Sequence, residues 1–105
     1  MSGYRLTPDA QSDLVEIRRY TLKQWGSLQS QEYLSALRQT IRLLAETPTF
    51  GKQRPDVASG VFSFPHMSHV IYYVIHTHEL IVFGVFGVLH KRMVPFKHLE
   101  NRAMI

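Results

Sequence analysis

Two stretches in the first half of the chain repeat apolar residues with the three-to-four-residue spacing of an α-helix. The first is predicted to begin at Thr7-Pro8, a good cap followed by a proline, and to end at Gly26. The second begins near Ser27 or Ser30 and ends at Thr47-Pro48, because the residue before a proline is pushed out of the α region. The connection is so short that the helices must run antiparallel, as a hairpin. Their apolar stripes are Ala10, Leu14, Ile17, Thr21 and Trp25, and then Leu34, Leu37, Ile41 and Leu44.

The rest of the pattern predicts strands, rich in β-branched and aromatic residues and separated by turn signals. A short alternating segment, Tyr4–Leu6, predicts a strand before the first helix. Proline and glycine punctuate Pro48–Gly60, which predicts a long loop, and loops near this length are often functional. Three further strands are expected at Val61–Phe64, stopped by Pro65, at Val70–Ile75 and at Leu80–Leu89, with turns at His66–Ser68 and His76–Glu79. The order β-α-α-β-β-β predicts a single α+β domain over residues 1–105, a helix hairpin on a mainly antiparallel sheet; the neighbour of the first strand is left open.

The last two predicted strands are apolar on both faces. Val70, Tyr72 and Val74 alternate with Ile71, Tyr73 and Ile75, and Ile81, Phe83, Val85 and Leu89 oppose Leu80, Val82, Phe86 and Val88. One helix hairpin covers only one face of a sheet, so something else should cover part of the other. The alternatives are the C-terminal tail folding back, a second copy of the chain, or a dedicated partner chain. Gly84 and Gly87 interrupt the long strand and indicate a bulge, a close approach or simple relief of sheet twist, of which twist relief is favoured.

Composition limits the chemistry and the compartment. The 105 residues are 45% hydrophobic and 19% charged, which is typical of a globular protein. The net charge of +4 suits an acidic partner. The chain has no cysteine, which excludes disulfides, thiolate metal sites and cysteine nucleophiles and fits a reducing cytoplasm. No apolar signal segment is visible at the N-terminus, and the longest apolar run, Leu80–Leu89, is about half of a membrane span. We therefore expect a cytoplasmic protein without a membrane partner.

Metal, cofactor and duplex DNA sites are not expected. The chain has six histidines, of which the pair His66-x-x-His69 spans one predicted turn and the pair His76-x-His78 another, and no convergent ligand set is evident. No glycine-rich phosphate loop or dinucleotide fingerprint occurs, so no cofactor is predicted. Neither predicted helix carries a continuous basic face of the kind that reads duplex DNA.

Several local signatures, taken in order, resemble the ParE branch of the ParE/RelE toxin superfamily. They are Leu6-Thr7-Pro8-Asp9-Ala10, Leu44-Ala45-Glu46-Thr47-Pro48, Gly51 with Arg54-Pro55, Phe64-Pro65 with His69-Val70-Ile71-Tyr72-Tyr73, and Val88-Leu89-His90-Lys91-Arg92 with Pro95, His98 and Leu99. Each signature is weak alone, but together they span nearly the whole chain.

The resemblance implies the toxin of a bacterial type II toxin–antitoxin system of the plasmid-stability kind, in complex with a ParD-like antitoxin. In such pairs the C-terminal segment of the antitoxin wraps the toxin and its N-terminal part binds DNA. ParE-like toxins are associated with poisoning DNA gyrase, whereas RelE-like relatives cut messenger RNA on the ribosome. A degenerate, non-toxic member that only binds its antitoxin is a third alternative. For antitoxin contact we expect the exposed sheet face and the outer groove of the helix hairpin.

The candidate target-binding residues are cations. Five of them follow the last predicted strand, namely His90, Lys91, Arg92, Lys97 and His98. Arg54, in the long loop, is the sixth. With Lys52 they could form an acid, base and cation set for RNA cleavage if they converged. Phe96 stands where a RelE-like enzyme would place a tyrosine, and phenylalanine cannot transfer a proton. A basic binding patch is the simpler interpretation, so we predict no catalytic residue.

Overall fold

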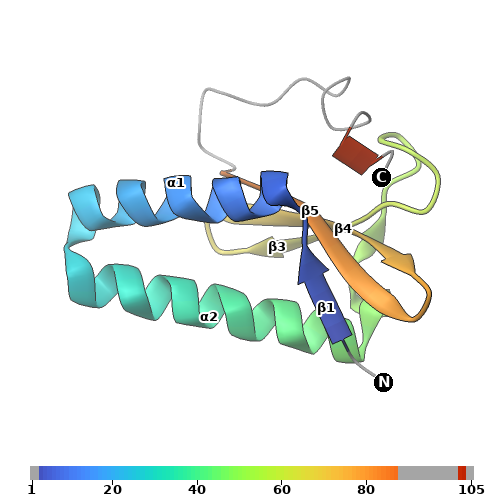
Figure 1. The fold of residues 1–105 in the computed structure, drawn as a ribbon, viewed down its shortest axis with the longest axis horizontal. Coiled ribbons are helices and arrows are strands. Elements are labelled where there is room, and N and C mark those ends of the chain that lie inside the picture. Colours follow the sequence, from blue (N-terminus) through green and yellow to red (C-terminus); the bar gives the residue numbers. More distant parts are fainter. Residues whose placement is uncertain (1–2, 88–101, 104–105) are drawn as a thin grey trace.

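The chain folds into a helix hairpin that packs on one face of a five-stranded mixed sheet (Figure 1). The computed structural model describes residues 3–87 and 102–103. The elements are β1 (Gly3–Leu6), α1 (Pro8–Trp25), α2 (Ser27–Glu46), the 3-10 turn η1 (Pro48–Phe50), β2 (Lys52–Gln53), β3 (Phe62–His66), β4 (His69–His76) and β5 (Glu79–Gly87). The predicted α+β class and order are confirmed, and η1 and β2 are additional elements inside the segment predicted as a loop.

The helix boundaries follow from the predicted capping residues. Thr7 is extended, and its hydroxyl accepts a hydrogen bond from the Ala10 amide at 3.1 Å. Gly26 has a φ of +88°, in the left-handed region that favours glycine, and it is the only residue between α1 and α2. Its amide donates to Leu22 O and its carbonyl accepts from Ser30 N, so one residue reverses the chain. The predicted antiparallel hairpin is confirmed (Figure 1).

A buried hydroxyl pair joins the two helices close to this turn. Thr21 and Ser30 are both buried, and their side-chain oxygens lie 2.7 Å apart. The Thr21 hydroxyl also bonds the Ile17 carbonyl at 2.8 Å, whereas Ser30 has the Thr21 hydroxyl as its side-chain partner within the described residues. The pair satisfies two polar groups where bulkier side chains would separate the helices.

Replacing Thr21 with valine is therefore expected to cost about 1–3 kcal/mol of unfolding free energy, because it leaves the buried Ser30 hydroxyl unsatisfied. The double variant Thr21→Val, Ser30→Ala should cost clearly less than the sum of the two single variants. Urea unfolding of the four proteins of this cycle measures the coupling. Additive losses would show that the two hydroxyls do not depend on each other.

The sheet has the strand order β1-β5-β4-β3-β2. β1 pairs in parallel with β5, which settles the neighbour of the first strand, and the other pairs are antiparallel. Both predicted turns are present, between β3 and β4 and between β4 and β5. The prediction that Pro65 stops a strand is wrong, because Pro65 pairs with Val70 inside β3. Proline is tolerated there because β2 pairs only with Phe62 and Ser63, so β3 is an edge at Pro65.

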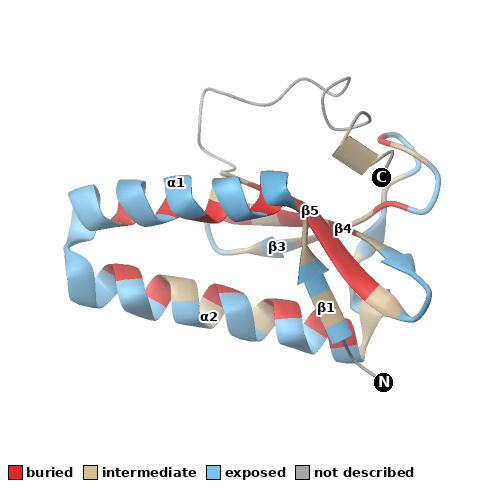
Figure 2. Ribbon diagram, in the orientation of Figure 1, coloured by how far each residue is buried: buried red, intermediate tan, exposed pale blue. Residues whose placement is uncertain are grey.

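The main core lies between the hairpin and the sheet. Figure 2 shows buried positions on the sides of α1 and α2 that face each other and along β5. The core contains most of the predicted stripes together with Ile71, Tyr73, Leu80, Val82 and Val85 from the sheet. Trp25 is the exception, because it is 45% exposed at the end of α1 and rests against Tyr20 and Tyr33.

A β-bulge changes the faces predicted for the long strand. Tyr72 pairs with Gly84 and Tyr73 with Val82, so Phe83 is an extra residue in β5. The extra residue inverts the alternation beyond it. Val85 therefore joins Leu80 and Val82 in the main core, while Phe86 joins Phe83 on the opposite face. The predicted grouping of Phe86 with Leu80 and of Phe83 with Val85 is wrong for this reason.

The opposite face is covered in part by the chain itself. Val57 and Val61, from the segment between β2 and β3, form a second buried cluster with Phe83. Ala58, Tyr72, Val74, Phe86 and Ala103 pack around this cluster. Figure 1 shows residues 102–103 beside the loop that supplies Val57. Over Phe83 the expected cover is therefore supplied by the loop between β2 and β3, which was not one of the three predicted alternatives, and Ala103 near the C-terminus packs beside it.

Candidate partner-binding surfaces

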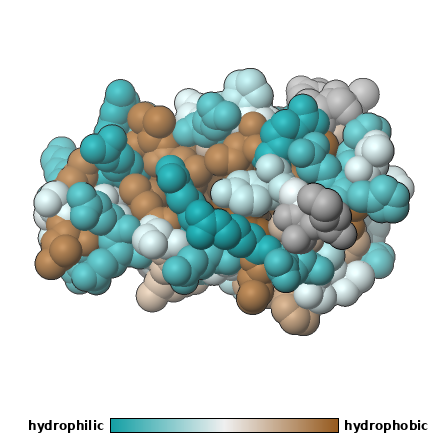
Figure 3. All heavy atoms as spheres, turned by 60° about the horizontal axis from the view of Figure 1, so that its bottom comes forward, coloured by the Kyte–Doolittle hydropathy of each residue, from teal (hydrophilic) through white to brown (hydrophobic). Residues whose placement is uncertain are grey.

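A groove runs along the outer side of the helix hairpin, next to β1; we call it the hairpin groove. One hollow of about 410 Å³ lies between α1, α2 and β1, and a second of about 470 Å³ continues it over α1 and α2. The apolar residues of the groove are Tyr4, Leu6, Leu14, Val15, Leu34 and Ile41. Figure 3 shows an apolar area on this side of the molecule, crossed and bordered by hydrophilic side chains. The hairpin groove is the structural counterpart of the outer groove expected from the sequence.

The charge of the hairpin groove has one sign. Arg18 and Arg38 line both hollows, and Arg42 lines the second. No aspartate or glutamate is among the lining residues, and within the described chain no ion pair holds any of these arginines. On α2, Arg38 stands four residues from Leu34 and four from Arg42, so apolar and cationic side chains share one helix face. A groove of this kind suits an amphipathic segment that carries carboxylates.

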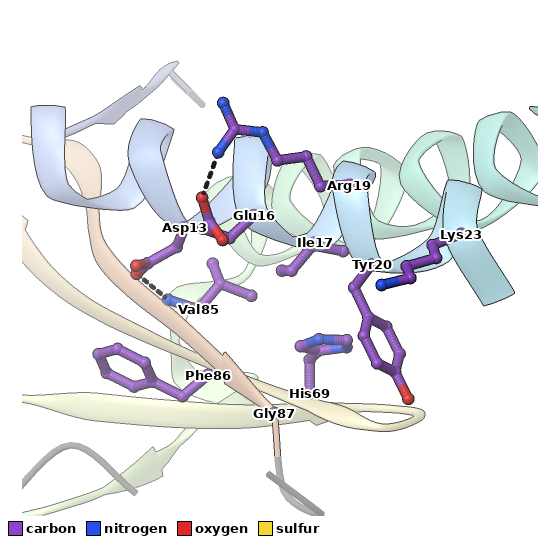
Figure 4. Close-up of a pocket in the computed structure, with 10 residues that line it drawn as sticks. All are labelled: Asp13, Glu16, Ile17, Arg19, Tyr20, Lys23, His69, Val85, Phe86 and Gly87. Atoms are coloured by element: carbon purple, nitrogen blue, oxygen red, sulfur yellow. Dashed lines mark hydrogen bonds and ion pairs between the residues drawn. The ribbon is translucent and has the colours of Figure 1, made fainter. Parts of the chain in front are cut away.

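A third hollow, of about 460 Å³ and separate from the hairpin groove, lies between α1 and the ends of β4 and β5. Figure 4 shows Asp13 of α1 pointing toward the backbone of β5, with Phe86 and His69 on the sheet side. The Asp13 carboxylate accepts the Val85 amide at 3.0 Å and an Arg102 guanidinium nitrogen at 2.8 Å. Burial raises the pKa of Asp13, while the Val85 amide and Arg102 act in the opposite direction. Asp13 therefore joins α1, β5 and the C-terminal residues.

Two histidines flank Tyr33 where α2 meets the β3–β4 turn. The Tyr33 hydroxyl lies 2.5 Å from His69 Nδ1, and the Thr40 hydroxyl lies 2.9 Å from His66 Nδ1. Both imidazole rings also contact the Tyr33 ring, with centroid separations of 5.7 and 5.5 Å. Burial raises the pKa of Tyr33 and lowers the pKa of His66, whose Nε2 is buried without a hydrogen-bond partner in the described chain. These contacts dock the β3–β4 turn on α2.

The lowered pKa of His66 predicts a pH dependence of stability. The unfolded chain binds a proton on His66 more tightly than the folded chain does. The contribution of neutral, buried His66 to the free energy of unfolding is therefore complete above the ordinary histidine pKa of about 6.5 and is lost as the pH falls below it. Urea unfolding at pH 7.5 and 5.0 should show a lower free energy at pH 5.0, and His66→Asn should reduce that difference. The matched control is His78→Asn, at an exposed turn position with positive φ, which asparagine tolerates. An unchanged difference in His66→Asn would contradict the assignment.

Arg54 is held by its neighbours. Its guanidinium donates to both Asp56 carboxylate oxygens, at 3.0 and 2.9 Å, and to the Ser63 hydroxyl at 3.2 Å. It also lies 5.6 Å from the centroid of the Tyr72 ring. These contacts fix the loop on the second sheet face. The other predicted target-binding residues, His90, Lys91, Arg92, Lys97 and His98, lie outside the described residues.

Within residues 3–87 and 102–103, no group of three or more histidine, aspartate or glutamate side chains comes close enough to hold a metal ion. In the same part of the chain, neither helix has the length and apolar character needed to cross a membrane.

Comparison with known proteins identifies the family. Residues 4–95 match the family model described as the ParE toxin of the type II toxin–antitoxin system parDE. The chain belongs to the ParE toxin family. This ParE-family toxin is 32% identical to Toxin ParE1 of Caulobacter vibrioides over 94% of its own length and 99% of the relative. It is 34% identical to Toxin ParE1 of Mycobacterium tuberculosis, over 88% of its own length and 92% of the relative.

The fold of the toxin is also found in a solved structure. A chain of the chromosomal ParDE toxin–antitoxin system from P. aeruginosa matches with a TM-score of 0.73, over 84% of the toxin and 97% of that chain. Their sequence identity is 17%, so this match shows the shared fold.

Sequence reasoning anticipated the place of the hairpin groove but not the residues that line it. The signal was present, because Arg38 and Arg42 are four residues apart on the α2 face that carries Leu34. The role of Asp13 gave no local signal. It is an acidic residue in the N-terminal half of a helix, a position that the helix dipole alone would explain.

Proposed function

We propose that this ParE-family toxin acts in the cytoplasm, inhibits growth by binding DNA gyrase, and is neutralised by a ParD-like antitoxin that docks in the hairpin groove. The family match over nearly the whole chain supports the toxin role. The observation that carries the antitoxin site is the apolar hairpin groove, in which the described lining residues include three arginines and no carboxylate.

An antitoxin segment can use both features of the hairpin groove. Its apolar residues would cover Val15, which is 50% exposed, and the partly exposed Leu34 and Tyr4, which removes apolar surface from water. Its carboxylates would meet the arginines, whose planar guanidinium groups favour paired hydrogen bonds to carboxylates. The opposite sheet face exposes less apolar surface for a partner to cover, because Val57 and Val61 already cover Phe83.

For target action we retain the basic residues of the C-terminal part of the chain, His90, Lys91, Arg92, Lys97 and His98, as the proposed gyrase-binding set. Arg54 is the weaker member of that set, because Asp56 and Ser63 already use its guanidinium. Binding without catalysis needs no acid and base pair, and Phe96 offers no group for proton transfer.

Two purified assays test the proposed target. In a DNA supercoiling assay with gyrase, the toxin is expected to inhibit, and the inhibition should be relieved by the antitoxin encoded beside it. In a translation mixture with ribosomes, messenger RNA should remain intact. Codon-linked RNA cleavage would replace the gyrase proposal with the endonuclease alternative. Growth unaffected by induced toxin alone would indicate the non-toxic, antitoxin-binding alternative.

A further inference from the structure

Arg102, three residues before the end of the sequence, is held against α1 and β5 by several contacts at once. Its guanidinium Nη1 lies 2.8 Å from Asp13 Oδ2, and its Nε lies 3.5 Å from Asp9 Oδ2. The side chains of Arg102 and Asp13 are only 13% and 15% exposed. By comparison, the Arg19–Glu16 pair on the outside of α1 is 73% and 68% exposed. Desolvated, hydrogen-bonded pairs depend on both partners much more than exposed pairs do.

The strand opposite α1 completes this arginine site. The Arg102 guanidinium carbon lies 4.9 Å from the centroid of the Phe86 ring, and Nη1 lies 3.5 Å from the Phe83 carbonyl. A Cβ at Gly84 would stand 2.9 Å from the Phe86 ring and 3.5 Å from Arg102 Nη1. Glycine at this position lets the aromatic ring and the guanidinium pack closely against the strand. Carboxylate, ring face and carbonyl therefore surround a single side chain that is 89 residues from Asp13 in the sequence.

We propose that Asp13 and Arg102 form a latch that fixes the C-terminal end of the chain to the body of the toxin, and that both are positioning residues for target binding. This inference rests on the proposed function, because the proposed gyrase-binding set precedes Arg102 in the sequence and follows Gly87. Gly87 is the last residue of β5 as described, and Arg102 contacts α1 and β5, so the two described residues that flank this part of the sequence both lie on the body of the toxin. A segment attached at both ends loses less conformational entropy on binding than one attached at one end.

Three variants isolate the latch. Arg102→Gln removes the charge and keeps most of the stem, and Asp13→Asn keeps an oxygen that can accept the Val85 amide while removing the carboxylate charge. The double variant should lose no more activity than either single variant, because each alone already opens the latch. Arg19→Gln is the matched control, since it removes the same charge from the exposed Arg19–Glu16 pair.

Energy transfer reads the latch directly. Trp25 is the only tryptophan and the chain has no cysteine, so a cysteine added after Ile105 carries the sole acceptor label. The donor, Trp25, lies twelve residues along α1 from Asp13, the residue that Arg102 contacts, which is about 18 Å at the helical rise. A separation of this size between the donor and the latch suits energy transfer. Transfer should fall in Arg102→Gln and Asp13→Asn and stay unchanged in Arg19→Gln. Unchanged transfer in Arg102→Gln would overturn the latch.

Activity separates positioning from fold stability. The concentration for half-inhibition of gyrase and the inducer level for growth arrest should rise at least tenfold in Arg102→Gln and in Asp13→Asn, at a temperature where circular dichroism shows that each variant is still folded. Equal activity of Arg102→Gln and the unmodified toxin would overturn the positioning role. A toxin that arrests growth without inhibiting gyrase would overturn the proposed target, and growth arrest would still decide the latch. An unmodified toxin with neither activity would overturn both.

Discussion

Replacing Phe83 with alanine is expected to lower the free energy of unfolding by about 3–5 kcal/mol, the range for truncating a buried aromatic side chain. Phe83 is fully buried and is the residue that the bulge in β5 adds to the strand. Its ring fills the second cluster with Val57 and Val61, so truncation leaves a cavity beneath the loop. Native domains are stable by only about 5–15 kcal/mol, so this loss is a large fraction of the total stability.

The matched control is Phe50→Ala, because Phe50 in η1 is 56% exposed. Its effect should stay within about 0.5 kcal/mol, as is usual for surface substitutions. Urea unfolding followed by circular dichroism compares the two variants. Equal effects would mean that the second cluster contributes little to stability and that the opposite sheet face is in practice open.

The helices and the element order could be predicted because their signals are local. Thr7, Pro8 and Gly26 act within one turn of the residues they cap, and the apolar stripes repeat at helical spacing. The bulge could not be predicted, because an extra residue such as Phe83 changes pairing without changing composition. The Asp13–Arg102 pair is also beyond local reasoning, since it joins residues at the two ends of the chain.

The second cluster alters where a partner is needed. A strand with apolar residues on both faces predicts that both faces are covered, but it does not predict which segment covers them. Here the segment between β2 and β3 packs over Phe83. The loop is held in this position by Arg54, which joins Asp56, Ser63 and the Tyr72 ring. The apolar surface that a partner could still cover is therefore on the hairpin, where Val15 and Leu43 are 50% and 56% exposed. Three arginines on the same hairpin have no ion pair in the described chain.

Reversing the charge of Arg38 is expected to weaken antitoxin binding about a hundredfold, equivalent to about 2.7 kcal/mol. Arg38 lines both hollows of the hairpin groove, so a glutamate at that position would meet the carboxylates of the docked segment. Like charges opposed in an interface cost several kcal/mol and slow association. The side chain is exposed, so the fold should be unaffected. Calorimetric titration of the toxin with a purified ParD-like antitoxin, the proposed partner, gives the affinity.

Arg19→Glu is the control, because it makes the same charge change at an exposed α1 position that does not line the hairpin groove. It should alter the affinity less than threefold. Raising the salt concentration should weaken binding of the unmodified toxin more than binding of Arg38→Glu, since screening removes attraction in one case and repulsion in the other. An affinity of Arg38→Glu equal to that of the unmodified toxin would place the antitoxin on another surface. Comparable losses in both would instead indicate that net charge, and not the hairpin groove, governs the association.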